Sequence, residues 1–366
     1  MKQITIENLH CTDDLESFGD ELRLEIYTDG ELETAYRNRM HDGDDWAVKA
    51  GALFDDVCTI KLIEEDKGFP AGDDDLIGTV IIGGAEVSGA TADIKRGDAD
   101  YTITYSVRDR TDVDADSRAD IAAAEFERSE QAGVWAAIDK ATLLGNVRDR
   151  QNRAIEIDQE RSNFCGPTSV VYELARTQPR RYVEMCRQLY ETGGFWSRSE
   201  RVEAPQSLRS DAVGQKMDPA DWMLIATMRN AENALFKVKA ASRGIRSGLE
   251  GMTHPWEIKG WAEEILGKDD VDVKTCFVFG ELDAIKRAQE AFDAGGSAFI
   301  LLNMAVLKSG ERDIPPWPDH WVVFHGNLDI TDDRVTYDVY TWGKIMTLDL
   351  DRERFEDHIF TVVTAV

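Results

Sequence analysis

At 366 residues the chain is longer than one hydrophobic core usually serves, so we expect two domains. Its formal net charge of −28 disfavours nucleic-acid binding, because phosphate recognition needs clustered Lys and Arg side chains. The five widely spaced cysteines include no C-x-x-C pair, and no apolar run approaches the roughly eighteen residues of a membrane span. We therefore expect cytoplasmic synthesis, without a disulfide framework, zinc knot, signal peptide or membrane helix.

Residues 1–107 are predicted to form an all-β sandwich. Short alternating or β-rich runs are divided by polar turns, and they cover residues 4–6, 22–27, 59–63, 78–82 and 101–107. This part contains 25 acidic and 9 basic residues, so more than half of the excess negative charge lies in less than a third of the chain. Such a shift in composition predicts a domain boundary near residue 107.

Two acidic segments of this domain, residues 62–66 and 73–78, resemble the calcium-loop strand pair of C2 domains. In that pattern acidic side chains converge on Ca²⁺, a hard ion that prefers carboxylate oxygens. The resemblance implies a C2-like sandwich with Glu64, Asp66 and Asp75 as calcium ligands and with Asp14 and Asp20 as further donors. The sequence departs from the pattern by Glu at the first position and by a longer loop. Solvated acidic turns, or a carbohydrate-binding or delivery sandwich, are the alternatives.

Residues 108–158 are predicted to be a linker followed by a helix. Residues 109–120 are polar and turn-like, whereas residues 121–144 are rich in Ala and have helical spacing. Gly145 then provides a C-cap. This segment separates the sandwich from a third segment, residues 159–366.

Residues 159–366 are predicted to form an α+β domain, in which helices come first and strands later. Helical spacing predicts helices over residues 166–176, 180–191, 219–235, 255–266 and 281–294, with Asp218 and Thr253 as N-caps of two of them. Apolar and β-branched runs predict strands over residues 276–279, 297–302, 320–324, 335–342 and 360–363. A polar turn joins strands 320–324 and 335–342, so we expect them to pair.

Cys165 is the candidate nucleophile, at the start of the predicted helix 166–176. A thiolate is the reactive form, and the N-terminal end of a helix favours it by lowering the thiol pKa. A lone cysteine more often packs as a small hydrophobic side chain, so the assignment depends on a neighbouring base.

His320 is the candidate base, because it opens strand 320–324 directly after the rigid, Pro-rich residues 315–319. Across the predicted hairpin, Asp338, Tyr340 and Trp342 share one face by the two-residue period of a strand. We expect Asp338 to fix the imidazole tautomer and to stabilise the imidazolium.

From Gln159 onward the chain resembles a papain-like cysteine peptidase. Gln159 lies six residues before Cys165, which is the spacing of the oxyanion-hole glutamine in that family. Far downstream, His320 begins a strand, and the sequence Thr341-Trp342-Gly343 resembles the family's Ser-Trp-Gly. The resemblance implies a papain-like domain over residues 159–366, with Cys165, His320 and Gln159 as catalytic residues.

The sequence departs from the family at the third catalytic position. The family's Asn or Asp directly precedes its Ser-Trp-Gly, and Tyr340 stands there in this chain. Asp338 is the nearest substitute on the same face, and Asp329 is a weaker one. A Cys–His dyad without a third residue is the remaining alternative.

A more diffuse similarity, over residues 163–169, 220–223, 229–233 and 320–323, is to cysteine-peptidase-like domains of bacterial polymorphic toxins and secreted effectors. It implies a protein or peptide substrate and export by a route that needs no signal peptide. It also implies an immunity or delivery partner, with the sandwich as the delivery module.

These patterns together predict a cysteine-nucleophile hydrolase, a thiol peptidase or amidase that acts through a thioester and requires no cofactor. A deamidase or transglutaminase that uses the same Cys–His pair is one alternative. The other is a non-catalytic protein that binds calcium, lipid or glycan and carries a degenerate peptidase fold. We expect contact with a membrane surface only if the C2-like loops bind calcium.

Overall fold

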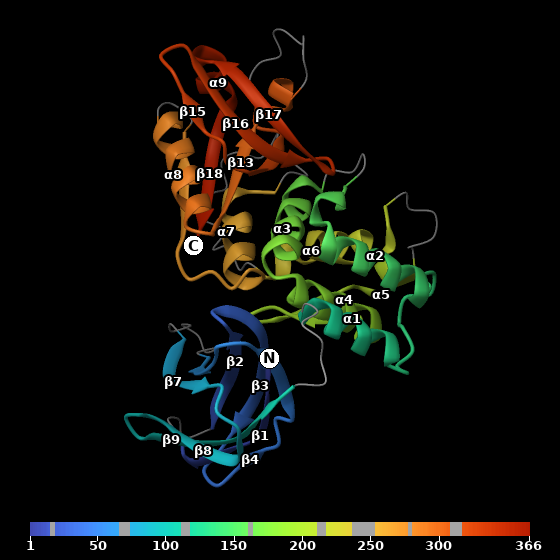
Figure 1. Cartoon of the computed structure of the whole chain (residues 1–366), viewed down its shortest axis with the longest axis vertical. Helices are drawn as coiled ribbons and strands as arrows, with labels where there is room; N and C mark the ends of the chain where they lie inside the picture. The colour runs from blue at the N-terminus through green and yellow to red at the C-terminus, as the bar shows by residue number, and fades with distance from the viewer. Residues whose placement is uncertain are drawn as a thin grey trace. The chain divides into compact units, whose positions relative to one another are not determined.

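In the computed structural model the chain divides into two compact units, Met1–Ile121 with Trp196–Ser199, and Ala122–Phe195 with Glu200–Val366 (Figure 1). The structure describes residues 1–14, 19–65, 74–110, 118–159, 164–210, 217–235, 253–276, 280–307 and 317–366. The first unit extends past the expected boundary at residue 107, to the start of the first helix, α1 (Arg118–Arg128).

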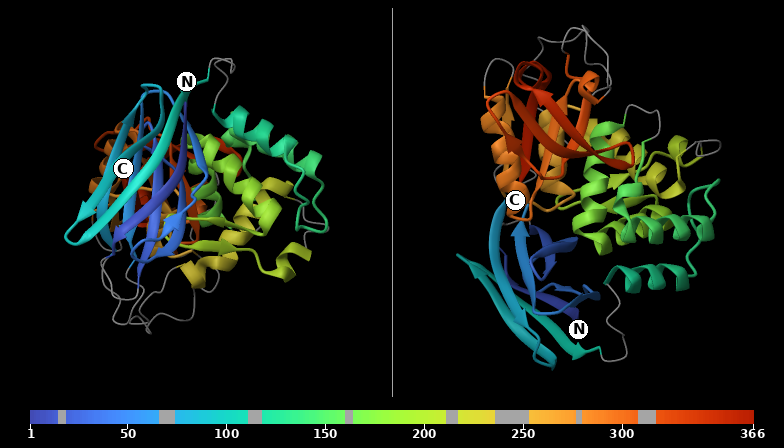
Figure 2. Two further views of the ribbon diagram at one scale, coloured as in Figure 1. Left: turned by 90° about the horizontal axis from the view of Figure 1, so that it is seen from below. Right: turned by 45° about the horizontal axis from the view of Figure 1, so that its top comes forward.

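The N-terminal unit is a sandwich of two antiparallel sheets (Figures 1 and 2). One sheet has the order β4-β1-β9-β8 with β5 beside β1, and the other has the order β3-β2-β6-β7. One core cluster draws on both sheets, with Ile4 and Ile103 from the first and Leu24 and Ile60 from the second fully buried. The strands are β1 (Lys2–Asp13), β2 (Asp20–Thr28), β3 (Glu31–Met40), β4 (Asp45–Trp46), β5 (Ala50–Phe54), β6 (Val57–Glu64), β7 (Asp75–Gly83), β8 (Val87–Arg96) and β9 (Ala99–Asp109).

The five strands expected from the sequence all fall within observed strands, namely β1, β2, β6, β7 and β9. Buried and more exposed side chains alternate along much of β1 and β9, which is the pattern of a strand with one buried face, whereas β2 is buried along nearly its whole length. The sequence pattern missed β3, β4, β5 and β8. The reason is clearest in β8, an edge strand that buries only Ile94 and therefore shows no apolar alternation.

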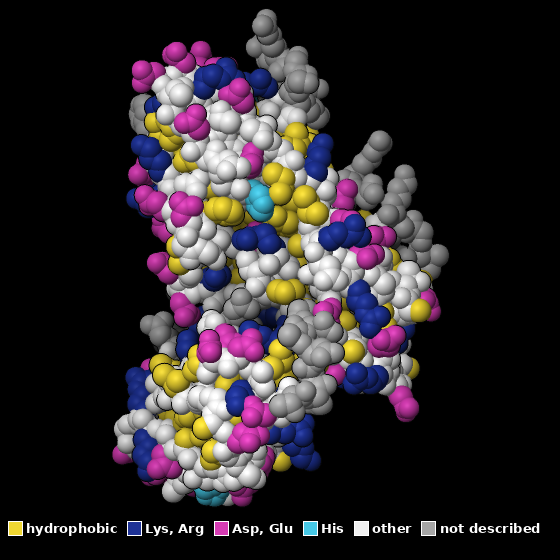
Figure 3. All heavy atoms as spheres, in the orientation of Figure 1, with side chains coloured by type: hydrophobic (Ala, Val, Ile, Leu, Met, Phe, Trp, Pro, Cys, Tyr) yellow, Lys and Arg dark blue, Asp and Glu magenta, His cyan; other side chains and the backbone are white. Residues whose placement is uncertain are grey.

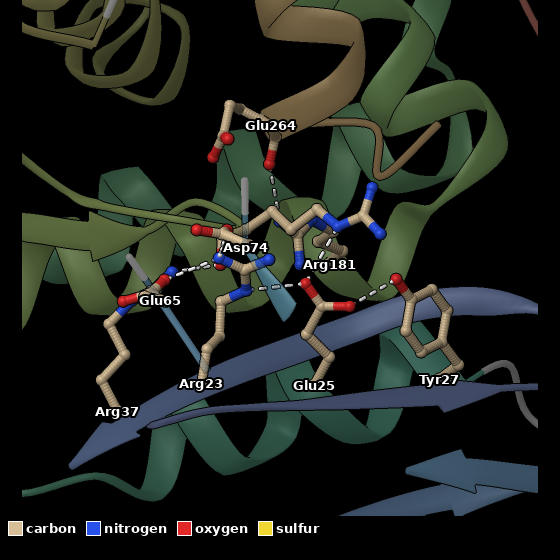
Figure 4. A network of polar contacts seen from close by, with 9 residues as sticks. Arg23, Glu25, Tyr27, Arg37, Glu65, Asp74, Arg181 and Glu264 are labelled. Carbon is tan, nitrogen blue, oxygen red and sulfur yellow. Dashed lines mark hydrogen bonds and ion pairs between the residues drawn. The ribbon is translucent and has the colours of Figure 1, made fainter. Parts of the chain in front are cut away.

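Charged side chains on β2 are buried in a network (Figure 4). The carboxylate of Glu25, which is fully buried, accepts hydrogen bonds from Arg23 Nε at 3.0 Å and from the Tyr27 hydroxyl at 2.8 Å. Arg198 Nε reaches the same carboxylate at 2.9 Å. Arg198 lies in Trp196–Ser199, the short segment that joins this unit from far along the chain. Ion pairing therefore holds this segment on β2.

The C-terminal unit is built on a seven-stranded antiparallel sheet with the order β12-β18-β13-β14-β16-β15 and with β17 beside β16. A separate short hairpin is formed by β10 and β11. The strands are β10 (Gly194–Trp196), β11 (Arg201–Glu203), β12 (Val271–Thr275), β13 (Ser297–Leu302), β14 (His320–Phe324), β15 (Asp329–Ile330), β16 (Arg334–Thr341), β17 (Lys344–Asp351) and β18 (Ile359–Ala365).

Helices precede and cover this sheet. Helix α3 packs against β14, α7 packs against β12 and β18, and α8 packs against β13 and β18. The helices are α2 (Lys140–Asn152), α3 (Cys165–Thr177), α4 (Pro179–Thr192), α5 (Gln206–Ser210), α6 (Pro219–Leu235), α7 (Pro255–Glu264), α8 (Glu281–Asp293) and α9 (Arg352–His358), with 3₁₀ turns at Ala154–Glu156 and Met304–Leu307. The unit is therefore α+β, as expected.

The single helix predicted over residues 121–144 is wrong, because the structure has two helices there, α1 and α2. The chain between them turns so that the buried Trp135 donates its indole N–H to Leu189 O at 2.8 Å. Gly133 passes so close to Tyr190 that a Cβ there would lie 2.1 Å from the ring. Gly145, the expected C-cap, lies inside α2. Tertiary contacts with α4 thus interrupt a locally helical sequence.

Three smaller expectations also differ from the structure. The N-cap of α7 is His254, one residue after the predicted Thr253. The strand predicted over 276–279 falls largely outside the described residues, at 277–279, and the observed strand ends before it at Thr275. Strand β17 was not predicted, since its outward side chains are mostly polar and exposed.

Acidic and basic side chains are interspersed over the face drawn in Figure 3, despite the net charge of −28. Over the described part of the chain, each helix is too short or too polar to cross a bilayer.

Candidate functional site

Cys165 is the first residue of α3, the helix that packs on β14. Its side chain is 8% exposed, and its carbonyl oxygen accepts a hydrogen bond from Ser169 Oγ at 2.8 Å. The next residue must be glycine for steric reasons, because a Cβ on Gly166 would lie 2.3 Å from Thr253 Oγ1. This close approach brings Thr253 against the helix start, and its carbonyl oxygen accepts the Trp321 indole N–H at 2.8 Å. The start of α3 is thereby packed against the start of β14.

His320 is the first residue of β14 and is 2% exposed. Its Nε2 lies 2.7 Å from Thr341 Oγ1, at the end of β16. The Trp342 ring lies against the imidazole, with ring centroids 5.0 Å apart and an interplanar angle of 32°. The imidazole is therefore held on one edge by a hydroxyl and on its face by an indole.

Trp342 occupies a strained backbone position. It forms the two-residue turn between β16 and β17 with Gly343, and both residues have positive φ, 50° and 67°. This geometry matches a type I′ turn, in which Asn or Gly normally stands at the first position. A bulky side chain there costs on the order of 1–3 kcal/mol. The turn places the indole over His320.

Gln159 is 5% exposed and follows the 3₁₀ turn Ala154–Glu156. Tyr340 connects this segment to the sheet: its hydroxyl donates to Ile157 O, and its ring stacks on Tyr172 with centroids 3.5 Å apart. Tyr340, which stands where the third catalytic residue was expected, thus has a packing role. It holds the segment that carries Gln159 against α3 and β16.

These elements enclose one small cavity. Its volume is about 10 Å³, close to the smallest space that holds a water molecule. The described side chains therefore leave room beside the thiol for a water-sized group only. Its lining residues are Gln159, Cys165, Thr168, Ser169, His320, Trp321, Tyr340, Thr341 and Trp342.

The pKa values of Cys165 and His320 differ from those expected for a catalytic cysteine at the N-terminus of a helix and its base. Burial raises the pKa of the Cys165 thiol, although the backbone N–H groups of Trp321 and Gly166 and the charge of Arg229 act in the opposite direction. Burial also lowers the pKa of His320 from 6.5 to about 4. Both groups are therefore uncharged near neutral pH, and the expected depressed thiol pKa is wrong for this structure.

The structure does not bring Asp338 to His320, which corrects the expectation that Asp338 orients the imidazole. The Asp338 carboxylate accepts hydrogen bonds from Asn327 Nδ2 and Thr347 Oγ1, each at 2.6 Å. Its backbone pairs with His325, five residues beyond His320 along the chain. Pleating also places Asp338 and Thr341 on opposite faces of β16.

Asp329, the weaker candidate, lies in the exposed strand β15 opposite Thr336. The residue that meets His320 is Thr341, which the sequence pattern did not indicate. The two-residue period shows only that Thr341 lies on the opposite face of the strand from Asp338, and the pairing of β14 with β16 brings Thr341 to His320.

The structure describes two of the three proposed calcium ligands. Glu64 and Asp75 are cross-strand partners on β6 and β7, and Asp75 pairs with Arg96 at 2.8 Å. Asp66 lies outside the described residues. In the N-terminal loop region, burial and then the charges of Asp42 and Asp20 raise the pKa of Asp14, and buried Asp20 accepts the Tyr101 hydroxyl. Among the described residues no His, Cys, Asp or Glu side chains group as metal ligands do, so calcium binding stays a prediction.

No protein-family model matches the chain, and no curated protein matches it. Solved structures similar to it include a C2 domain, 14% identical over 30% of this chain and 100% of that chain, with a TM-score of 0.25. A C2 domain of a plant extended synaptotagmin 1 is 8% identical over 30% of this chain and 95% of its own, with a TM-score of 0.20. A human GIVD cytosolic phospholipase A2 is 8% identical over 30% of this chain and 17% of its own, with a TM-score of 0.22. These similarities give the papain-like resemblance no support, so that fold stays a prediction.

Proposed function

We propose that the C-terminal unit is a cysteine-nucleophile hydrolase of the papain-like type. The observation that carries the proposal is that Cys165 and Gln159 line one buried cavity together with His320, which lies far from both in sequence. A thiol, an imidazole and an amide donor are the groups that acyl transfer through a thioester requires.

In the proposed reaction, Cys165 Sγ attacks the carbonyl carbon of an amide while His320 accepts the thiol proton. The Gln159 side-chain amide and the Cys165 backbone N–H stabilise the oxyanion. His320 then gives its proton to the leaving amine as the C–N bond breaks, which leaves a thioester on Cys165. Water, deprotonated by His320, attacks the thioester and releases the carboxylic acid, and the thiol regains its proton. Because the resting pair is uncharged, proton transfer accompanies the attack.

The substrate is proposed to be a protein or peptide, with a backbone amide or a glutamine side-chain amide as the bond that breaks. Release of ammonia without chain cleavage would identify a deamidase. Incorporation of an added primary amine would identify a transglutaminase. Both use the same Cys165–His320 pair and differ in the leaving group or acceptor.

The proposal is tested by labelling the full-length protein with iodoacetamide at neutral pH and locating the label by peptide mass spectrometry. We expect Cys165 to label faster than the buried thiols of Cys186 and Cys276, and we expect His320→Ala to remove that difference. Cys165→Ala controls for site assignment. Equal labelling of the three cysteines in the wild-type protein would contradict the proposal.

The sandwich is proposed to serve as a binding or delivery module for this enzyme, and an immunity or delivery partner is part of the same proposal. Toxicity on expression that Cys165→Ala abolishes would support an effector role. Calcium-dependent binding to phosphatidylserine vesicles that survives Cys165→Ala would instead favour the non-catalytic, lipid-binding alternative.

A further inference from the structure

The imidazole of His320 meets the hydroxyl of Thr341 on its Nε2 edge. The two atoms lie 2.7 Å apart, and the side chains are buried, with His320 at 2% and Thr341 at 4% exposure. A hydrogen bond between buried groups is costly to break, because the group left behind loses its partner without regaining water. The contact therefore fixes how the ring is turned.

We propose that Thr341 is the positioning residue for His320 and the third member of the site, in place of an Asn or Asp. This inference rests on the proposed hydrolase function. In this proposal Nε2–H donates to Thr341 Oγ1, which leaves the lone pair of His320 on Nδ1, and Cys165 lines the same cavity as His320. That tautomer is the one in which the imidazole acts as a base.

A hydroxyl differs from a carboxylate in two ways that matter here. It carries no charge, so it orients the imidazole without stabilising the imidazolium. It can also donate as well as accept a hydrogen bond, whereas a carboxylate only accepts. The site is therefore built around a neutral base that becomes charged only during the reaction. Burial as the cause of the low pKa of His320 agrees with this arrangement.

Two substitutions separate the hydroxyl from the shape of the side chain. Thr341→Val keeps the branched shape and removes the hydroxyl, whereas Thr341→Ser keeps the hydroxyl and removes a methyl group. In the iodoacetamide assay on the full-length protein, we expect Thr341→Val to label Cys165 about 10- to 100-fold more slowly than wild type. We expect Thr341→Ser to stay within about threefold of wild type, by the same reasoning. Asp338→Asn is the matched control and is expected to label at the wild-type rate.

A second readout does not depend on the reactivity of Cys165. In protein labelled with ¹⁵N-histidine, the two ring nitrogens of His320 report its tautomer, and His320→Gln assigns the signal among the six histidines. We expect one fixed tautomer in wild type and in Thr341→Ser, and a changed tautomer population in Thr341→Val.

The inference is overturned if the ring signals of His320 are the same in Thr341→Val and wild type, or if Thr341→Ser behaves as Thr341→Val does. Failure of the hydrolase proposal looks different, because Cys165 would then label slowly in every variant. The nitrogen signals would still decide the role of Thr341.

Discussion

Acidification should destabilise the C-terminal unit through His320. The perturbation is a fall in pH from 7 toward 4, with His320→Gln as the comparison, since a glutamine amide still offers Thr341 a hydrogen-bond partner. The pKa of His320 is lowered from 6.5 to about 4 in the folded protein because of burial. Below pH 6.5 the unfolded chain therefore binds more protons at this residue than the folded chain does.

The sign and size of the change in the free energy of unfolding follow from this difference in bound protons. Stability contributed by neutral His320 is fully present above pH 6.5 and is lost as the pH falls toward 4. The full loss is about 3 kcal/mol, at roughly 1.4 kcal/mol per pH unit, and about 2 kcal/mol of it is expected by pH 5. Other titrating groups change stability too, but they do so in both proteins, so the difference between wild type and His320→Gln isolates this residue.

Urea unfolding followed by tryptophan fluorescence measures this difference, because seven of the nine tryptophans lie in the C-terminal unit. We expect the free energy of unfolding of wild type to fall by about 2 kcal/mol more than that of His320→Gln between pH 7 and pH 5. His41→Gln, at an exposed histidine of the sandwich, is the surface control. Equal losses of unfolding free energy in wild type and His320→Gln would refute the burial of a neutral imidazole.

Three further pairs of substitutions test local features of the structure by the same unfolding measurement. Gly166→Ala should cost about 1–3 kcal/mol, because a Cβ there would meet a buried threonine. Gly145→Ala, where a Cβ meets no atom within 4 Å, should instead stabilise the protein by about 0.5–1 kcal/mol. Similar effects at both sites would contradict the close packing of Gly166 against Thr253. Trp342→Asn should be more stable than Trp342→Ala by about 1 kcal/mol, because Asn tolerates the positive φ of the turn. A higher stability of Trp342→Ala would argue against that turn. Glu25→Ala should cost about 3–5 kcal/mol, because it removes a buried carboxylate that pairs with Arg23 and Arg198. Asp349→Ala, in an exposed ion pair, should cost at most about 1 kcal/mol. Equal costs would show that the β2 network contributes no more than a surface pair.

The sequence by itself determined the elements that local patterns specify. The predicted helix at 219–235 and the predicted strands at 297–302 and 320–324 coincide with α6, β13 and β14, because apolar periodicity and capping residues act within one element. The sequence patterns failed for elements whose structure depends on contacts with a distant part of the chain. The helix predicted over 121–144 is interrupted by contacts with α4, and the edge strand β8 lacks the alternation that burial imposes.

The candidate site divides in the same way. Spacing in the sequence selected Gln159, Cys165 and His320, and the fold brings all three to one cavity. The tertiary structure alone decided that Thr341, not Asp338, meets His320, because strand register and pleat set which side chain reaches a neighbouring strand. The tertiary structure also decided the charge state of Cys165 and His320. The pKa of a thiol or an imidazole depends on how completely the surrounding elements exclude water from it.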